Sequence, residues 1–184
     1  MKVSISKGPK FVIDPYDGTT GLYMACTFLK QSIKHILKIS DMLGIPAPNE
    51  EKLHTTVLYS PEGRPDVDKL DSLIARHGTR FYAEIAKVSV HRGHDNKYYV
   101  VINLDTTSAN GQELLELHED LKLIGGKHSY PMFNPHITLY SSEDDIMQDK
   151  SFVKNLQRTN DHVKNQRIYP LIMNLEVPAK LIGD

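Results

Sequence analysis

The sequence contains a single cysteine, Cys26, in 184 residues. A lone thiol excludes an internal disulfide and supplies no thiolate cluster for zinc, which is typical of a protein in a reducing cytosol. No apolar run approaches the ~20 residues that are needed to span a bilayer. The start MKVSISKGPKFV lacks the long apolar segment and the cleavage site of a signal peptide. We therefore expect a cytoplasmic protein that is neither membrane-bound nor secreted.

The sequence also has almost no net charge, because 22 basic residues nearly balance 23 acidic ones. No overall field would therefore attract duplex nucleic acid or an anionic membrane. The sequence also lacks a Gly-rich turn between a strand and a helix, which disfavours a dinucleotide site. We expect a nucleotide ligand to be held by a local site, without a cofactor and without a metal ion.

The sequence repeats one order of elements in its two halves, as judged from apolar spacing, β-branched runs and turn residues. The first half predicts a strand over 22–28, a helix over 33–43 ended by Gly44, a strand over 52–60, a helix over 66–77 ended by Gly78, and one long strand over 79–91. The second half predicts a strand over 98–105, a helix over 111–124 ended by Gly125 and Gly126, a strand over 135–140, a weaker helix over 146–156, and edge strands within 167–182. Both halves thus follow the order β-α-β-α-β.

This duplication predicts an α+β fold of the bilobal β-α-β-α-β type. Residues 1–184 would form a single domain, with one lobe over about 22–91 and the other over about 98–180. If a pseudo-twofold axis relates the lobes, their antiparallel sheets would line a central cleft, with the helices outside. A doubly wound α/β sheet is the alternative.

A His-x-Thr pattern occupies the matching strand in each half. His54 and Thr56 lie in HTTVLYS, and His136 and Thr138 lie in HITLYSS. Because side chains alternate along a strand, each histidine shares a face with its threonine. The residues expected on the opposite, more apolar face are Thr55, Val57, Tyr59, Ile137 and Leu139. A twofold relation between the lobes would bring two imidazoles and two hydroxyls together across one groove.

A pattern this short also arises by chance, as His77-Gly78-Thr79 illustrates. That copy straddles a helix end, so we interpret His77 as a helix-terminal histidine. The plain alternative for His54 and His136 is that local hydrogen bonds satisfy two strand histidines. The shared strand context, the shared apolar run and the matching position in both halves argue against this alternative.

The chemistry that needs this set of side chains is phosphodiester cleavage without a metal. Histidine titrates near neutral pH, so one imidazole can take a proton from a nucleophile while a second, protonated one gives a proton to the leaving oxygen. Threonine hydroxyls can donate hydrogen bonds to the non-bridging phosphate oxygens. The sequence does not decide which histidine is the acid and which is the base.

The paired motifs resemble those of the 2H phosphoesterase superfamily, which has a LigT-like fold and includes cyclic nucleotide phosphodiesterases. The likeness covers roughly Leu22 to Val177, with HTTVLYS and FNPHITLY as its specific parts. It implies that His54, Thr56, His136 and Thr138 form the catalytic tetrad. The stretches DGTTGLYMACTF and FYAEIAKVSV are most similar to phage anti-CBASS enzymes, which degrade the cyclic oligonucleotides with which bacteria signal infection. The likeness thus implies a phage protein that acts in the cytoplasm of a host bacterium.

This resemblance implies a metal-independent phosphodiesterase, a hydrolase and nuclease that opens the 3′-5′ linkages of cyclic di- and trinucleotides. The first alternative is a 2H enzyme that acts on 2′,3′-cyclic phosphates or RNA ends. A non-catalytic sponge that holds a cyclic nucleotide in the same groove is an alternative of another class. A metallohydrolase that uses His91 and His94 is a further alternative.

Aromatic residues near the motifs are candidate platforms for a nucleobase, which is held chiefly by stacking. Tyr23 shares a strand face with Ala25 and Thr27, the small and polar side, so we expect it to line the groove. Tyr130 and Phe133 precede the second motif, where they would form a lid or a stacking wall. The alternatives are a core or surface role for Tyr23 and packing beneath the loop for Phe133.

Other polar residues have plainer interpretations. The segment from His91 to Asn96 offers two histidines and an aspartate to a metal, but its Gly, Asp and Asn residues fit a turn between strands. His118 lies between two glutamates of a helix, which predicts a solvated position. Cys26 lies on the apolar side of its strand and is expected in the core.

Overall fold

A computed structural model of the chain describes residues 22–60, 66–125, 132–165 and 170–176. Within these residues, seven strands form one antiparallel sheet in the order β3-β7-β1-β2-β6-β5-β4. The strands are β1 (Leu22–Phe28), β2 (His54–Ser60), β3 (Arg80–Ala83), β4 (Ile85–Arg92), β5 (Tyr98–Leu104), β6 (His136–Ser142) and β7 (Leu171–Leu175). The helices are α1 (Lys30–Leu43), α2 (Val67–His77), α3 (Ala109–Leu123) and α4 (Lys150–Asn165), with short 3₁₀ turns at Glu50–Lys52 and Ile146–Gln148.

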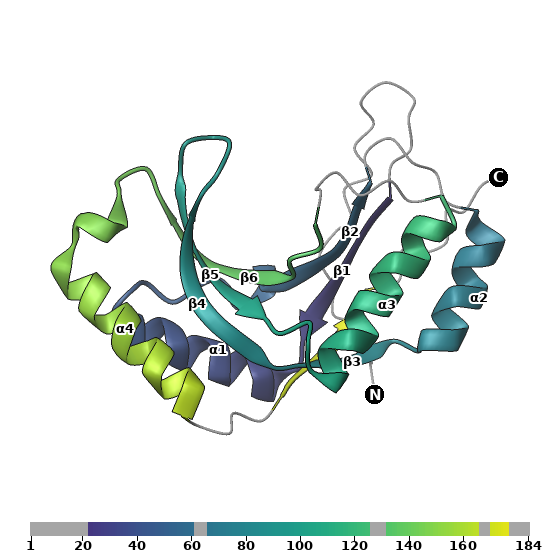
Figure 1. Cartoon of the computed structure of the whole chain (residues 1–184), viewed down its shortest axis with the longest axis horizontal. Helices are drawn as coiled ribbons and strands as arrows, with labels where there is room; N and C mark the ends of the chain where they lie inside the picture. Colours follow the sequence, from purple (N-terminus) through teal and green to yellow (C-terminus); the bar gives the residue numbers. More distant parts are fainter. Residues whose placement is uncertain (1–21, 61–65, 126–131, 166–169, 177–184) are drawn as a thin grey trace, which may run out of the picture.

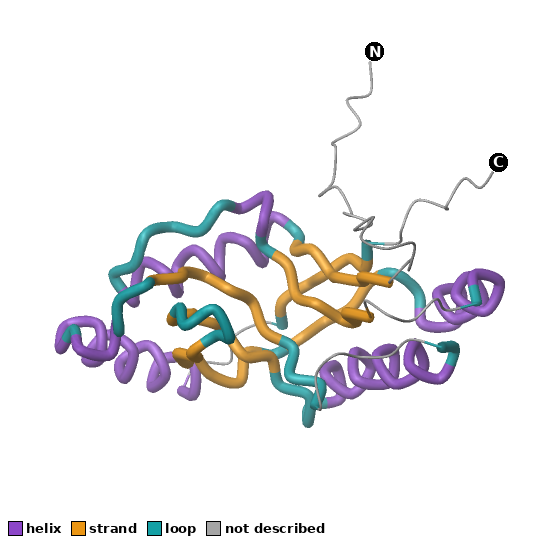
Figure 2. The backbone as a smooth tube through the Cα atoms, turned by 90° about the horizontal axis from the view of Figure 1, so that it is seen from above, coloured by secondary structure: helices purple, strands orange, loops and turns teal. Residues whose placement is uncertain are grey.

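The helices cover the outside of the sheet, and the strands lie between them (Figure 2). Helix α3 contacts β2 and β3, whereas α4 contacts β4 and α1. One apolar core joins these helices to one face of the sheet and includes Cys26, Ile36, Leu117, Ile137 and Met173. The α+β fold class, with antiparallel strands and helices outside, is therefore confirmed. None of the described helices is long and apolar enough to cross a membrane.

The sheet curls so strongly that its two edge strands follow each other in the sequence (Figure 1). Only Glu84 separates β3 at one edge from β4 at the other, so the prediction of one long strand over 79–91 is wrong. The carboxylate of Glu84 accepts hydrogen bonds from Ser108 Oγ (2.6 Å) and Asn110 Nδ2 (2.7 Å). Its carbonyl accepts one from the Asp105 amide (2.8 Å). These contacts fix the break against the start of α3.

The strands of the duplicated plan also mix in space. Strand β7, from the second half of the sequence, pairs with β1 and β3. Strand β4, from the end of the first half, pairs with β5 of the second half. The two expected sheets are continuous through the pairing of β2 with β6. The division into lobes at about 22–91 and 98–180 stays a prediction.

Two helix boundaries test the signals read from the sequence. Helix α1 ends as predicted, because Gly44 follows it in the left-handed region with φ of 71°. Helix α4 begins at Lys150, later than predicted. Asp149 accepts hydrogen bonds there from the amides of Ser151 (2.8 Å) and Phe152 (3.3 Å), while residues 146–148 form a 3₁₀ turn. Helix α4 therefore begins at this cap and not at the predicted residue 146.

The start of α3 depends on Gly111. A Cβ atom added there would lie 1.8 Å from the carbonyl oxygen of Asp105, which is backbone and cannot swing away. We expect the Gly111→Ala variant to lose about 1–3 kcal/mol of unfolding free energy, the usual cost of overpacking. Urea titration followed by circular dichroism measures the loss. The matched change Gly78→Ala meets no atom within 4 Å but carries a positive φ, so it reports backbone strain alone.

Candidate active site

The two His-x-Thr motifs lie on adjacent strands at the centre of the sheet (Figure 1). Strands β2 and β6 run antiparallel, and Thr55 pairs with Ile137. Both of these side chains are fully buried, so the residues on either side of them point to the opposite face. His54, His136 and Thr138 are exposed there, and Thr56 is half-buried. The structure therefore brings the four residues predicted from the sequence onto one face of the sheet.

The pairing also fixes how the four side chains are arranged. Continuing the register by one residue in each direction sets His54 opposite Thr138 and Thr56 opposite His136. The two histidines then lie on a diagonal, where Cα atoms are typically about 7–8 Å apart. A local twofold axis through the pair of Thr55 and Ile137 exchanges one motif with the other. The four side chains thus have the pseudo-symmetric arrangement expected from the sequence, on adjacent strands of one sheet.

Each histidine ring is oriented by a backbone carbonyl two residues before it. His54 Nδ1 lies 2.8 Å from the oxygen of Lys52, and His136 Nδ1 lies 2.9 Å from the oxygen of Asn134. A carbonyl can only accept, so Nδ1 is the donor in both rings. Nε2 of each ring is therefore the atom that can accept a proton or, once protonated, donate one.

A β-bulge follows the threonine in both motifs. In β2, Thr56 pairs with Ala25 and Leu58 with Met24, which leaves Val57 as the extra residue. In β6, Thr138 and Tyr140 pair with consecutive residues of β5, which leaves Leu139 as the extra residue at the corresponding place. Bulges bend a strand and re-aim the side chains beyond them, often next to active sites.

The first bulge corrects one prediction and adds a residue to the face. Val57 and Leu58 are both buried, so Tyr59 does not lie on the core face as its sequence parity predicts. Its side chain is 42% exposed instead, and its ring meets that of Tyr23 edge to face at 6.2 Å. Strict alternation along the strand placed Tyr59 on the core face. A bulge depends on pairing with a partner strand, so the local sequence does not indicate it.

Tyr23 lies beside the first motif, on the face expected for it. Its hydroxyl is hydrogen-bonded to Thr56 Oγ1 (3.1 Å), and its ring lies edge to face with His54 at 6.3 Å. Burial raises the pKa of Tyr23, although the bond to Thr56 opposes the rise, so the hydroxyl stays protonated. Tyr23 thereby helps to orient Thr56, and its role as a base platform stays a prediction.

The other two aromatic candidates have different outcomes. Phe133 is half-buried and stacks on the ring of His118, with centroids 4.1 Å apart and planes at 10°. This contact occupies one face of its ring, in line with the alternative of packing beneath the loop. Tyr130 lies outside the described residues.

Neighbouring strands extend the polar face on both sides of the histidines. Thr27 pairs with His54, and its hydroxyl donates to Glu176 Oε1 (2.5 Å). Asn103 pairs with His136, and its amide donates to Ser89 Oγ (2.7 Å) and the carbonyl of Lys87 (3.3 Å). No sequence pattern points to Asn103 or Glu176, because they approach the motifs only through strand pairing.

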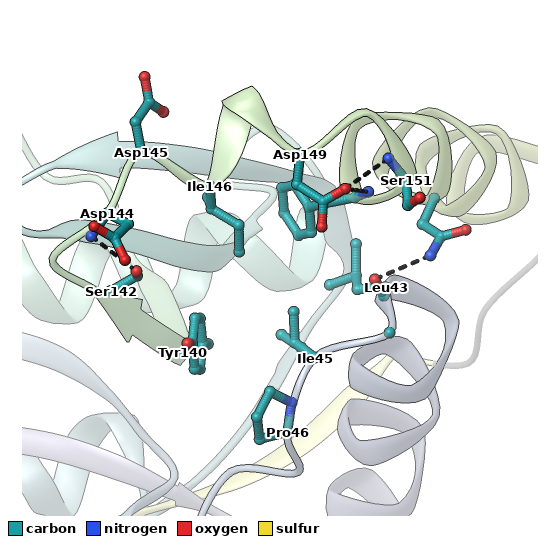
Figure 3. A pocket seen from close by; sticks show the side chains of 13 residues that line it. Leu43, Ile45, Pro46, Tyr140, Ser142, Asp144, Asp145, Ile146, Asp149 and Ser151 are labelled. Carbon is teal, nitrogen blue, oxygen red and sulfur yellow. Dashed lines mark hydrogen bonds between the residues drawn. The ribbon is translucent and has the colours of Figure 1, made fainter.

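Two hollows lie near the second motif. One, of about 370 Å³, borders Thr138 and is also lined by Pro48, Asn49, Lys52, Leu53, Leu139, Tyr140 and Ser141. The other, of about 360 Å³, lies beyond Tyr140 and contains none of the four motif residues (Figure 3). Asp144, Asp145 and Asp149 surround this second hollow, which disfavours an anionic ligand. The hollow beside Thr138 is the one that belongs to the candidate site.

The segment from His91 to Asn96 forms the predicted turn, which joins β4 to β5. Asn96 has a φ of 63°, and Asp95 accepts hydrogen bonds from the Tyr99 hydroxyl (2.6 Å) and the Lys97 amide (3.2 Å). The bond from Tyr99 is the main cause that lowers the pKa of Asp95. In the part of the chain that the structure describes, no three His, Cys, Asp or Glu side chains gather as a metal site.

Two other predictions about single residues have clear outcomes. Cys26 is fully buried, as predicted, and burial, reinforced by the carboxylate of Glu176, raises the pKa of its thiol. His118 is only 1% exposed, so the prediction of a solvated position is wrong. The apolar stripe of α3 includes Leu114, Leu117 and Leu121, and His118 lies at i+4 and i−3 from its ends. That spacing was a better signal than the neighbouring glutamates.

Comparison with known proteins gives one family and several relatives. The family described as "Anti-CBASS protein Acb1" matches residues 20–166. The chain is 33% identical over 128 residues to the anti-CBASS protein Acb1 of Vibrio phage KVP40, covering 69% of this chain and 75% of that protein. It is 27% identical over 124 residues to Acb1 of Enterobacteria phage T4, covering 67% and 73%. Among solved structures, Usb1 of Kluyveromyces marxianus has a TM-score of 0.40 at 13% identity, covering 78% of this chain and 82% of that one.

Proposed function

Because the chain belongs to the Acb1 family of anti-CBASS proteins, we propose that it is a phage phosphodiesterase that opens cyclic oligonucleotide messengers in the cytoplasm of the infected host. Its substrates are cyclic di- and trinucleotides, and it cleaves their 3′-5′ linkages. His54, Thr56, His136 and Thr138 carry out the reaction without a metal ion.

The observation that carries this proposal is the pair of oriented imidazoles. Each Nδ1 is committed to a backbone carbonyl, so both Nε2 atoms serve the same exposed face. A diagonal Cα separation of about 7–8 Å is compatible with one phosphate between the rings. An acid and a base placed on two sides of one phosphorus atom are what in-line displacement needs.

The reaction begins when Nε2 of one imidazole removes a proton from a ribose 2′-hydroxyl or from water. The freed oxygen forms a bond to phosphorus, and the bond from phosphorus to the 5′-oxygen breaks. The second imidazole, protonated at Nε2, gives its proton to that departing oxygen. The hydroxyls of Thr56 and Thr138 donate to the non-bridging oxygens, where negative charge accumulates in the transition state.

The surroundings of the tetrad suit a small nucleotide better than a long polymer. The hollow of about 370 Å³ beside Thr138 offers apolar walls together with the polar side chains of Asn49, Lys52 and Ser141. Tyr59 and Tyr23 add aromatic surface on the other side of the motifs. A nucleotide whose phosphate lies between the histidines would place its neighbouring nucleoside in this hollow.

Incubation with a panel of cyclic di- and trinucleotides and a 2′,3′-cyclic mononucleotide, in excess EDTA, tests the proposal. We expect a cyclic oligonucleotide to give a linear product in the presence of the chelator. A product of unchanged mass indicates attack by the 2′-hydroxyl, whereas the addition of one water indicates hydrolysis. Mass spectrometry separates the two.

The same incubation separates the alternatives. A sponge would return the cyclic ligand intact after heating, and a metallohydrolase would lose activity in EDTA. Turnover of the 2′,3′-cyclic mononucleotide alone would assign the chain to the other class of 2H substrates. Each of these outcomes contradicts the proposed function.

A further inference from the structure

Helix α3 places one buried histidine against the strand of the first motif. His118 is 1% exposed, and its Nδ1 lies 2.7 Å from the carbonyl oxygen of Val57. Because a carbonyl can only accept, Nδ1 carries the proton. Burial is the main cause that lowers the pKa of His118, although the bond to Val57 and the carboxylate of Glu119 oppose it. The ring is therefore neutral at neutral pH, with a fixed tautomer.

The carbonyl that His118 holds belongs to the bulge residue of β2. Val57 is the residue that the pairing of β1 with β2 skips, and it directly follows Thr56. The extra residue of a bulge is left unpaired in the ladder. A side-chain donor from α3 thus satisfies the backbone next to a candidate catalytic threonine.

The same ring contacts the approach to the second motif. Phe133 stacks on it with the planes at 10°, and the next residue is Asn134. The carbonyl of Asn134 accepts the hydrogen bond that orients His136 (2.9 Å). One imidazole therefore lies between the backbone that follows Thr56 and the backbone that orients His136.

We propose that His118 is a positioning residue that couples the two motifs, because it holds the bulge at Val57 with its Nδ1–H and the segment before His136 with its ring. This inference rests on the proposed function, since it concerns the geometry of the same tetrad. The reaction needs both histidines at one phosphorus atom, and a misplacement of about 1 Å can cost about 10²-fold in rate.

Two substitutions separate the hydrogen bond from the stacking. The His118→Phe variant keeps a ring against Phe133 but removes the donor to Val57. The His118→Asn variant keeps an N–H at the position of Nδ1 but removes the ring. We expect His118→Phe to lower kcat by about 10- to 100-fold with little change in KM, since geometry rather than substrate contact is lost. We expect His118→Asn, which keeps the donor but loses the contact with Phe133, to lower kcat as well, by less than His118→Phe does.

The matched control is another helix side chain that anchors a strand. Asn160 of α4 accepts from the Val88 amide (2.8 Å) and donates to the Val88 carbonyl (3.0 Å). We expect Asn160→Leu to lower Tm while kcat stays within about two-fold of wild type, because Val88 faces the core. All rates are measured at a temperature at which each variant is fully folded by circular dichroism.

A second readout does not depend on turnover. The ring ¹⁵N resonance of His54 is expected to shift in His118→Phe, which loses the hydrogen bond to the bulge, and that of His136 in His118→Asn, which loses the contact with Phe133. Unchanged resonances, or a kcat of His118→Phe equal to that of wild type, would overturn the positioning role. An equal loss of kcat in Asn160→Leu would also overturn it. Absence of turnover in the wild type rejects the proposed function instead, and the resonances then decide on His118 alone.

Discussion

The His54→Ala and His136→Ala variants are each expected to lower kcat for ring opening by about 10²- to 10⁴-fold, because each removes one of two proton transfers. Both rings are exposed and lie outside the apolar core, so Tm should change little. Initial rates by liquid chromatography and thermal melts by circular dichroism measure the two effects separately. An active-site role predicts a large loss of rate with the fold retained.

The control for this experiment is His94→Ala, which removes an exposed histidine from the turn between β4 and β5. It should leave kcat unchanged, whereas a metal site at His91 and His94 predicts a loss. The double variant of His54 and His136 should be little worse than either single one, because residues that act as a unit are not additive. Full turnover in either single alanine variant would remove the basis of the assignment.

The tetrad was accessible from sequence because every signal for it is local. Alternation along a strand predicts that His54 shares a face with Thr56, and the second motif, in β6, gives the same prediction independently. Val57 after the first motif and Ile137 within the second indicate a buried opposite face. Only the direct pairing of Thr55 with Ile137 had to come from the structure.

The features that sequence missed all depend on partners distant in the chain. The bulge at Val57 exists through its pairing with β1, and beyond it Tyr59 is exposed and contacts Tyr23. The break at Glu84 depends on hydrogen bonds from Ser108 and Asn110. Neither donor lies within residues 79–91, so the sequence of that segment alone predicts a continuous strand.

His118 illustrates a different kind of miss. The apolar spacing of α3 already placed position 118 on the core face, but the polarity of histidine and its glutamate neighbours favoured solvent. A buried imidazole is costly unless a partner satisfies it. The partner here is the spare carbonyl that the bulge creates at Val57. The bulge at Val57 thus explains both the exposure of Tyr59 and the burial of His118.

The Thr56→Val and Thr138→Val variants are each expected to lower kcat by about 10²-fold, the scale of losing one donor to a developing oxyanion. Valine has nearly the same shape as threonine and suits a strand, so the change removes a hydroxyl and little else. The matched control is Thr55→Val, one residue away on the opposite face. The Thr55 hydroxyl is buried and meets no partner among the described residues, so its removal should keep kcat and raise Tm slightly.

Phosphorothioate substrates then test which non-bridging phosphate oxygen accepts a hydrogen bond from each hydroxyl. The local twofold axis through Thr55 and Ile137 exchanges Thr56 with Thr138, so in the proposed reaction the two hydroxyls would approach the phosphorus atom from opposite sides. Sulfur accepts a hydrogen bond poorly, and the wild type should slow on both diastereomers. Thr56→Val should lose its sensitivity to one diastereomer and Thr138→Val to the other, because each variant no longer makes the bond that sulfur weakens. If both variants respond alike to both diastereomers, the hydroxyls do not divide the phosphate oxygens between them, and the twofold arrangement of the tetrad around phosphorus is wrong.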